Sequence, residues 1–186
     1  MFKYIRIVET AFILTIGATT LMSPRPATAA SAAAIDRDVD AALGKLYETT
    51  PEAKTLAAQA KGILVFPNIV KAGFVVGAQY GDGALLKDGR TVGYYNIVAA
   101  SYGLQAGLQS FGYAMFLMTD AALAYLNTSA GWEVGVGPSI VVVDAGMART
   151  LTTTTAQDDV YAFIFGQQGL MAGAGLQGSK ITKISP

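Results

Sequence analysis

The stretch from residue 60 to residue 77, AKGILVFPNIVKAGFVVG, decides the fold class that the sequence predicts for this chain of 186 residues. Its short runs of valine, isoleucine and phenylalanine are cut by glycine every few residues, which is typical of antiparallel strands. The dipeptides Asp82-Gly83 and Asp88-Gly89 predict tight hairpin turns on either side of residues 84–87. A similar texture further along the chain predicts strands over residues 132–143, 160–165 and 170–184.

No charged residue occurs between Arg90 and Asp120. A membrane-spanning helix is therefore an alternative to strands for this stretch. Glycine, serine, asparagine and glutamine are too frequent in this stretch for a helix that faces lipid. Alternate residues within 103–109 suit a strand that lies between neighbouring strands. We therefore expect this stretch to form strands of the same sheet.

Upstream of the strands, apolar residues recur at helical spacing and predict an amphipathic helix; they are Ile35, Val39, Leu43, Leu46 and Tyr47. Three alternating aspartates at 36, 38 and 40 fall in its first turns, where acids favour the helix dipole. The same aspartates would suit a calcium loop, but Ala41 stands where that loop needs glycine. We therefore expect a helix and no metal site.

Two shorter helices are also expected. Pro51, behind the possible cap Thr50, begins a second helix that ends near Gly62. Residues 120–127 predict a third, because apolar residues follow a capping residue there. The fold class is therefore α+β, with N-terminal helices packed on a curved, barrel-like antiparallel β-sheet and one short helix inserted near 120–127.

The N-terminus has the pattern of an export signal. Lys3 and Arg6 precede an apolar run over residues 11–22, and Ala27-Thr28-Ala29 supplies the small residues of a cleavage site. The run is shorter than the roughly 20 apolar residues that a transmembrane helix needs. We expect residues 1–29 to be a removable signal peptide and residues 30–186 to be one domain, exported to a periplasmic or extracellular location. An uncleaved anchor is the alternative.

Composition excludes several chemistries. The chain has no histidine and no cysteine, so it holds neither a Ser-His-Asp nor a Cys-His nucleophile, nor a zinc site of nitrogen and sulfur ligands. The 13 basic and 13 acidic residues argue against nonspecific nucleic-acid binding. We expect a protein that is not an enzyme and has no cofactor. A carboxylate-based enzyme that uses Glu133 and Asp144 is the remaining catalytic alternative.

One glycine motif invites a dinucleotide-binding interpretation. Residues 173–178, GAGLQG, match the spacing of the dinucleotide fingerprint. The fingerprint opens a helix and needs an acid about 20 residues later, whereas eight residues follow Gly178. Glycines in a strand that another backbone approaches closely are the better interpretation.

Four blocks of the chain resemble one known family. They are residues 60–77 quoted above, GLQAG at 103–107, Gly137-Pro138, and GQQGLMAGAGLQG at 166–178. In this order they resemble the SYLF domain, also called the Ysc84 or Las17-binding type, and the export signal is similar to that of a bacterial exported member. The blocks cover nearly all of the chain after residue 29.

The resemblance implies membrane-lipid binding, with phosphoinositides as ligands of eukaryotic relatives and actin as a partner of fungal ones. This chain has Gln79 and Asp82 where many relatives have basic residues, and Gln168 and Gly175 where the closing motif has lysine and serine. An exported chain is not expected to meet actin. We therefore expect a noncatalytic phospholipid-binding or membrane-associated envelope module, peripheral on a membrane.

The expected lipid-binding residues are Lys61, Lys71, Phe74, Lys87 and Arg90. Lys61 and Lys71 match the family motif, and Lys54, Lys87 and Arg90 join them if the helix end and the hairpin lie on one side. Each basic group near an anionic bilayer contributes about 1 kcal/mol, and an exposed Phe74 or Tyr80 would add apolar insertion. The expected partner is anionic membrane phospholipid, with no nucleic acid and no metal. Three alternatives stay open: ordinary solvated lysines, an integral outer-membrane β-barrel, and a structural or protein-binding periplasmic protein.

Overall fold

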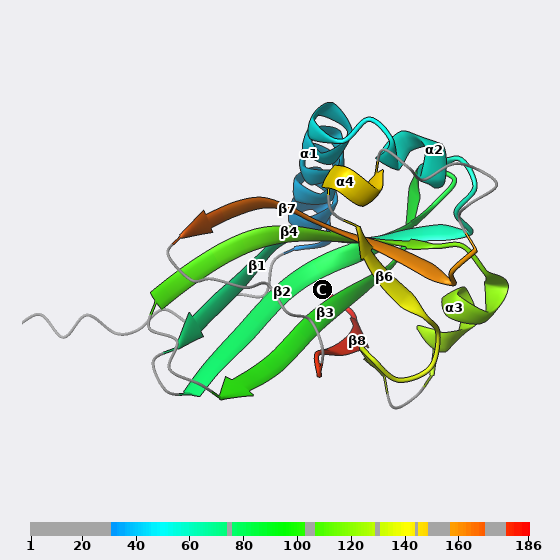
Figure 1. The fold of residues 1–186 in the computed structure, drawn as a ribbon. Helices are drawn as coiled ribbons and strands as arrows, with labels where there is room; N and C mark the ends of the chain where they lie inside the picture. Colours follow the sequence, from blue (N-terminus) through cyan, green and yellow to red (C-terminus); the bar gives the residue numbers. More distant parts are fainter. Residues whose placement is uncertain are drawn as a thin grey trace, which may run out of the picture.

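The computed structural model describes residues 31–73, 76–102, 107–128, 131–143, 145–148, 157–169 and 178–186. Two helices come first, then four long strands, then shorter elements (Figure 1). The elements are α1 (Ala32–Thr49), α2 (Ala53–Ala57), β1 (Gly62–Gly73), β2 (Val76–Lys87), β3 (Arg90–Tyr102), β4 (Gly107–Leu117), α3 (Asp120–Tyr125), β5 (Trp132–Glu133), β6 (Ile140–Val143), α4 (Ala145–Ala148), β7 (Val160–Gly169) and β8 (Lys180–Ile184).

The strands form one curled sheet in the order β5-β8-β3-β2-β1-β4-β7-β6, which makes a half-barrel (Figure 1). The predicted α+β class is confirmed. The sheet is mixed, however, because β6 pairs with β7 in parallel while the other pairs are antiparallel. A parallel pair needs a connection of about a dozen residues or more, and β6 and β7 are separated by 16 residues in the sequence.

Helix α1 is the predicted amphipathic helix. The Ser31 hydroxyl caps its first turn by accepting from the Ala34 backbone N–H at 3.3 Å. Ile35, Val39 and Leu46 are buried on the side that packs against β1 and β2. Asp36, one of the three alternating aspartates, accepts hydrogen bonds from the hydroxyls of Thr91 and Tyr94. Its carboxylate therefore ties α1 to β3.

The second helix is shorter than predicted. It begins at Ala53, and the predicted cap Thr50 instead ends α1, where its N–H donates to the Leu46 carbonyl. The third predicted helix is confirmed as α3, whose cap Thr119 accepts from the Ala122 N–H at 3.2 Å. Among the described residues, no helix is long and apolar enough to cross a membrane.

One predicted hairpin is confirmed and the other is wrong. Asp88 and Gly89 have positive φ angles of 49° and 71° and join β2 to β3. Asp82-Gly83 lies inside β2 instead. Glycine is required there by a close approach, since a Cβ on Gly83 would collide with the carbonyl oxygen of Val65 in the neighbouring strand. The dipeptide Asp-Gly therefore occurs both in a hairpin turn and at a close contact between two strands, and the sequence alone does not separate the two cases.

The strand predicted over 132–143 is two short strands, because Gly135 and Gly137 have positive φ angles of 103° and 92° and interrupt it. The strand predicted over 160–165 extends to Gly169 as β7. For the strand predicted over 170–184, the described part is β8, and residues 170–177 lie outside the described residues. Most of the motif at 173–178 therefore lies outside them too.

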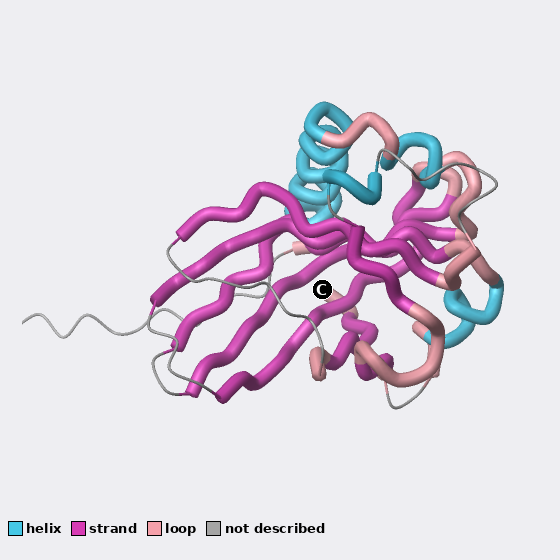
Figure 2. Tube along the Cα trace, in the orientation of Figure 1, coloured by secondary structure: helices cyan, strands magenta, loops and turns pink. Residues whose placement is uncertain are grey.

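The sheet has two faces, each with its own buried cluster of side chains. The inner face carries Leu64, Phe66 and Tyr113 and is closed by β5, β8 and α3. The outer face carries Val65 and Phe116 beneath α1 and α2. Helix α1 covers only part of that outer face, because the long strands extend well beyond it (Figure 2).

Candidate functional site

Three of the predicted lipid-binding residues lie at one end of the sheet. Lys61 precedes β1, and its backbone N–H donates to the Leu117 carbonyl at 2.7 Å. Lys87 and Arg90 are cross-strand partners that flank the hairpin between β2 and β3. All three side chains are exposed. Pairing of the start of β1 with the end of β2 brings the two segments together.

The structure does not bring Lys71 to the other three. Lys71 lies eight residues beyond Ile63 along β1, a distance of roughly 25 Å at the usual rise of a strand. Its side chain is 6% exposed and lies on the inner face, opposite Gln79 of β2 and Gln109 of β4. Phe74, the fifth predicted residue, lies outside the described residues.

Lys71 belongs to a buried polar row that the sequence did not predict. The Gln79 amide donates to the Ser179 hydroxyl at 2.8 Å, and both residues are buried. Gln109 is 4% exposed on the other side of Lys71. Tyr113 lies four residues further along β4, where burial raises the pKa of its hydroxyl. The row thus places polar groups inside the half-barrel, away from the exposed cations.

An apolar groove, here called the end groove, opens beside the three exposed cations. It lies between the two N-terminal helices and the paired ends of β1 and β2, and its volume is about 480 Å³. Burial raises the pKa of the Tyr47 hydroxyl on its wall. Most of its lining is apolar, and Asp88 is the acid among the lining residues; the apolar side chains are Leu43, Tyr47, Ala57, Ala58, Ala60, Ile63 and Leu86.

Four cations surround the end groove and form what we call the end cluster: Lys54, Lys61, Lys87 and Arg90. The Lys54 ammonium lies 5.8 Å from the centre of the Tyr47 ring, within range of a cation–π interaction. Lys61 stands between two lining residues of the groove, and Lys87 stands between two others. The sequence indicated all four of these cations but did not predict the groove, because its walls come from segments that only folding brings together.

A second feature that sequence reasoning missed is an exposed apolar surface on the outer face, beyond α1. Val98, Tyr80 and Val70 are directly paired across β3, β2 and β1, and their side chains are 44%, 50% and 39% exposed. A second line runs beside them and consists of Ala100, Ala78, Ala72 and Leu108. We call these two lines the outer apolar rows. A contiguous exposed apolar patch marks an interaction surface more often than scattered apolar residues do.

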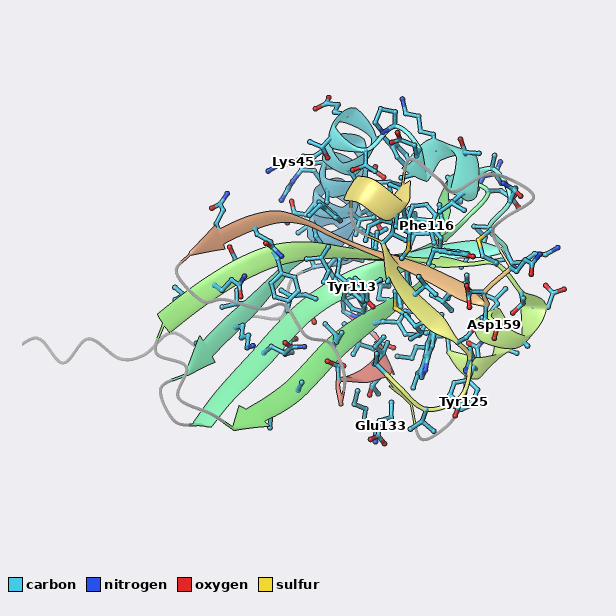
Figure 3. All side chains as sticks on the ribbon, in the orientation of Figure 1. Lys45, Tyr113, Phe116, Tyr125, Glu133 and Asp159 are labelled. Atoms are coloured by element: carbon cyan, nitrogen blue, oxygen red, sulfur yellow. The ribbon has the colours of Figure 1, made fainter. Side chains whose placement is uncertain are left out.

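The acidic side chains of the described residues bear on the metal and carboxylate-enzyme alternatives. No group of three or more carboxylate, histidine or cysteine side chains there is arranged to hold a metal. Glu133 projects from the lower rim, apart from the other labelled side chains (Figure 3). Asp144, its proposed companion in a carboxylate-based enzyme, lies outside the described residues.

Comparison with known proteins gives one family. The model of the family described as Ysc84, Las17-binding protein actin regulator, matches residues 98–185. The matched segment runs from within β3 to the end of β8, so it includes three of the four resembling blocks, at 103–107, 137–138 and 166–178, and leaves out residues 60–77. The search of curated proteins found no match.

Proposed function

Because the chain carries a Ysc84 (SYLF) domain, matched over residues 98–185, we propose that it is a noncatalytic module that binds phospholipid and associates with a membrane from one side. The observation that supports this is the end groove with the end cluster around it. An acyl chain needs an apolar surface, and a lipid phosphate needs cations beside that surface. The end of the sheet offers both within one site.

The size and the lining of the end groove suit part of a lipid. Its volume of about 480 Å³ falls within the range of roughly 300–1,000 Å³ that is common for small-molecule sites. Leu43, Ile63 and Leu86 come from three different elements and give the groove apolar walls. The groove is open rather than enclosed, so a lipid that remains in the bilayer would insert only a part of its length.

The charge of the end cluster sets the expected strength of binding. Each cation near an anionic bilayer contributes about 1 kcal/mol, so four contribute about 4 kcal/mol, and Asp88 opposes a part of this. Exposed charges are screened over about 10 Å at 0.1 M salt. We therefore expect weak binding to anionic membranes that falls steeply as salt is added.

Vesicle cosedimentation of the purified protein tests this proposal. Vesicles of phosphatidylcholine alone are compared with an equal mixture of phosphatidylcholine and phosphatidylglycerol, each at low and at high salt. We expect binding to the anionic vesicles at low salt. Equal failure to bind both compositions would contradict the proposal.

Two charge variants locate the site. Lys61→Gln with Lys87→Gln removes two cations of the end cluster, and about 1 kcal/mol for each predicts a loss of roughly 30-fold in affinity. The matched comparison is Lys61→Gln alone against Lys183→Gln, which removes one exposed cation from the inner-face side of β8, opposite Tyr95. If Lys183→Gln loses as much affinity as Lys61→Gln, binding follows net charge and the end cluster is not the site.

A further inference from the structure

A second pocket lies on the other flank of α1, where that helix meets β1, β4 and β7. Its volume is about 290 Å³, and we call it the Lys45 pocket. Leu43 and Tyr47 of α1 line the end groove, whereas Ala42 and Lys45 line this pocket. Lys45 projects from α1 above the end of β7 that extends beyond the helix (Figure 3). The pocket therefore opens on the same outer face as the end groove.

Two irregularities in the sheet create this pocket. The pairing of β1 with β4 shifts between Phe66 and Ile69, and the pairing of β4 with β7 shifts between Ser110 and Gly112. Such bulges leave backbone and side-chain polar groups outside the regular ladder. They bring the side chains of Asn68, Ser110 and Gln168 to the wall of one pocket.

Gly166 keeps the pocket open beside the lysine. It has a positive φ of 61°, and a Cβ placed on it would lie 3.4 Å from the Lys45 ammonium nitrogen. Any side chain at this position would therefore have a strained backbone conformation, and its Cβ would contact that nitrogen. The glycine lets the Lys45 ammonium sit directly against the strand.

The chemistry of the lining selects an anion. Lys45 is the charged residue among the side chains that line the pocket, and no carboxylate lines it. The amides of Asn68 and Gln168 and the hydroxyl of Ser110 offer neutral hydrogen-bond donors around it. An ammonium with several neutral donors and no acid is suited to a phosphate oxygen.

The Lys45 pocket is continuous with the outer apolar rows. Ser110 on its wall pairs with Val70 of the first row on one side and with Gln168 on the other. Leu108, two residues before Ser110, is 62% exposed at the end of the second row. An anion held by Lys45 would therefore have an apolar surface beside it, covering four strands.

We propose that the Lys45 pocket binds the phosphate of a phospholipid headgroup while the outer apolar rows contact the apolar part of the same bilayer leaflet. This rests on the proposed function, and it adds a second lipid contact on the opposite flank of α1. A lipid is favoured over a free phosphate because the cationic pocket lies beside an apolar surface. A free phosphate would make no favourable contact with Val70, Tyr80 and Leu108.

The first test measures affinity for vesicles of phosphatidylcholine and phosphatidylglycerol in equal parts. Lys45→Gln is expected to weaken binding about fivefold and Lys45→Arg to restore it. Leu108→Asn, at an exposed position, is expected to weaken binding to the same vesicles. Lys183→Gln is the matched control on the opposite side of the sheet, since Lys183 pairs with Tyr95 of the inner face. Wild-type affinity in both Lys45→Gln and Leu108→Asn overturns the proposal.

The second test distinguishes lipid from free anion by nuclear magnetic resonance of the backbone amides of Ser110 and Gly166. We expect a short-chain phosphatidylglycerol, dissolved below its micelle concentration, to shift both amides, and expect Lys45→Gln to abolish the shifts. Glycerol 3-phosphate is expected to shift them much more weakly. Equal shifts by glycerol 3-phosphate would mean that the pocket takes a free phosphate ester, and the lipid assignment would be wrong.

The two proposals fail in different ways. If Lys61→Gln with Lys87→Gln abolishes vesicle binding while Lys45→Gln and Leu108→Asn leave it unchanged, the proposed function stands and the Lys45 pocket is not a lipid site. If vesicles are not bound but the short-chain lipid binds through Lys45, the pocket binds a phospholipid phosphate, whereas the membrane function and the contact of the outer apolar rows with a bilayer are both wrong. A dimer in light scattering that Leu108→Asn disrupts would assign the outer apolar rows to a second copy and overturn the proposal.

Discussion

The Tyr80 hydroxyl donates a hydrogen bond to the Asp82 carboxylate at 2.6 Å, along one edge of the outer apolar rows. The two residues are two apart in β2, so both side chains lie on the outer face. The bond holds the one aromatic ring of the rows in place and directs its polar end toward a carboxylate. The ring is thereby left with an apolar body and a fixed polar tip, which is the form aromatic residues take at membrane surfaces.

The first prediction concerns the ionisation of Tyr80. The hydrogen bond from its hydroxyl to Asp82, with burial and the carboxylate charge, raises the pKa of Tyr80 to about 12. Because the folded pKa lies above the unfolded value of 10, the stabilising effect is complete below pH 10 and is lost as pH rises from 10 to about 12. Absorbance titration of tyrosinate in the wild type and in Tyr80→Phe isolates this group.

Asp82→Asn supplies the control for that titration. It removes the charge and weakens the hydrogen bond, so the pKa of Tyr80 should fall toward its ordinary value. An unchanged titration in Asp82→Asn would mean that the carboxylate does not hold the phenol proton.

The second prediction contrasts two glycines. Gly83→Ala should destabilise the protein, by about 2 kcal/mol or more, because its Cβ would collide with the Val65 carbonyl oxygen in the adjacent strand. Gly44→Ala should stabilise it by up to about 1 kcal/mol, because Gly44 lies within α1 and its Cβ would meet nothing within 4 Å. Urea denaturation measures both changes, and equal effects of the two substitutions would contradict the packing described for β2.

The third prediction concerns Asp159, which precedes β7 and points toward the region between β6 and α3 (Figure 3). Its carboxylate accepts from the backbone N–H and the hydroxyl of Ser139 and from the hydroxyl of Thr119. These hydrogen bonds lower the pKa of Asp159. The folded pKa lies below the unfolded value of 3.8, so the stabilising effect is present above that pH and is lost as pH falls below it.

The carboxyl carbon of Asp159, followed by nuclear magnetic resonance against pH, measures that pKa directly. Asp159→Asn should remove the corresponding part of the pH dependence of stability, and Asp158→Asn is the neighbouring control. A pKa of Asp159 at or above its ordinary value would contradict the hydrogen-bond pattern.

The fourth prediction concerns the N-terminus. If residues 1–29 are an export signal, expression with secretion should yield a mature chain that begins at Ala30. Mass spectrometry of the secreted product reads the first residue. Changing the small residues Ala27 and Ala29 to larger ones should block processing, and an intact N-terminus in the unaltered secreted protein would show that the signal is not removed.

Much of the fold was predictable because the signals are local. Apolar residues at helical spacing and the Ser31 cap specify α1 within a single segment. The turn at Asp88-Gly89 needs two residues with positive φ, and that dipeptide supplies them. The turn predicted at Asp82-Gly83 was wrong because this glycine is needed for close contact with Val65. Val65 lies 18 positions earlier in the chain and meets Gly83 only through the pairing of β1 with β2.

The candidate sites were less predictable, since they depend on which strands pair and in what register. Lys61 and Lys71 belong to one strand-forming segment and look equivalent in the sequence. In the structure, the register of β1 against β2 shifts between Val65 and Val70, and side chains alternate between the two faces of the sheet. As a result Lys71 is buried on the inner face, whereas Lys61 is exposed at the end of the sheet where β1 begins. No spacing rule within the segment predicts this difference.

By itself, the sequence determined the class of the fold, the positions of α1 and α3 and the absence of histidine and cysteine chemistry, because composition and short-range periodicity act within a few residues. Only the tertiary structure decided that β6 lies parallel to β7, that a groove opens beside Lys61 and Lys87, and that Lys45 stands at the edge of two exposed apolar rows. The physical reason is that each of these features joins segments far apart in the chain, and their meeting is set by the register of a curled sheet.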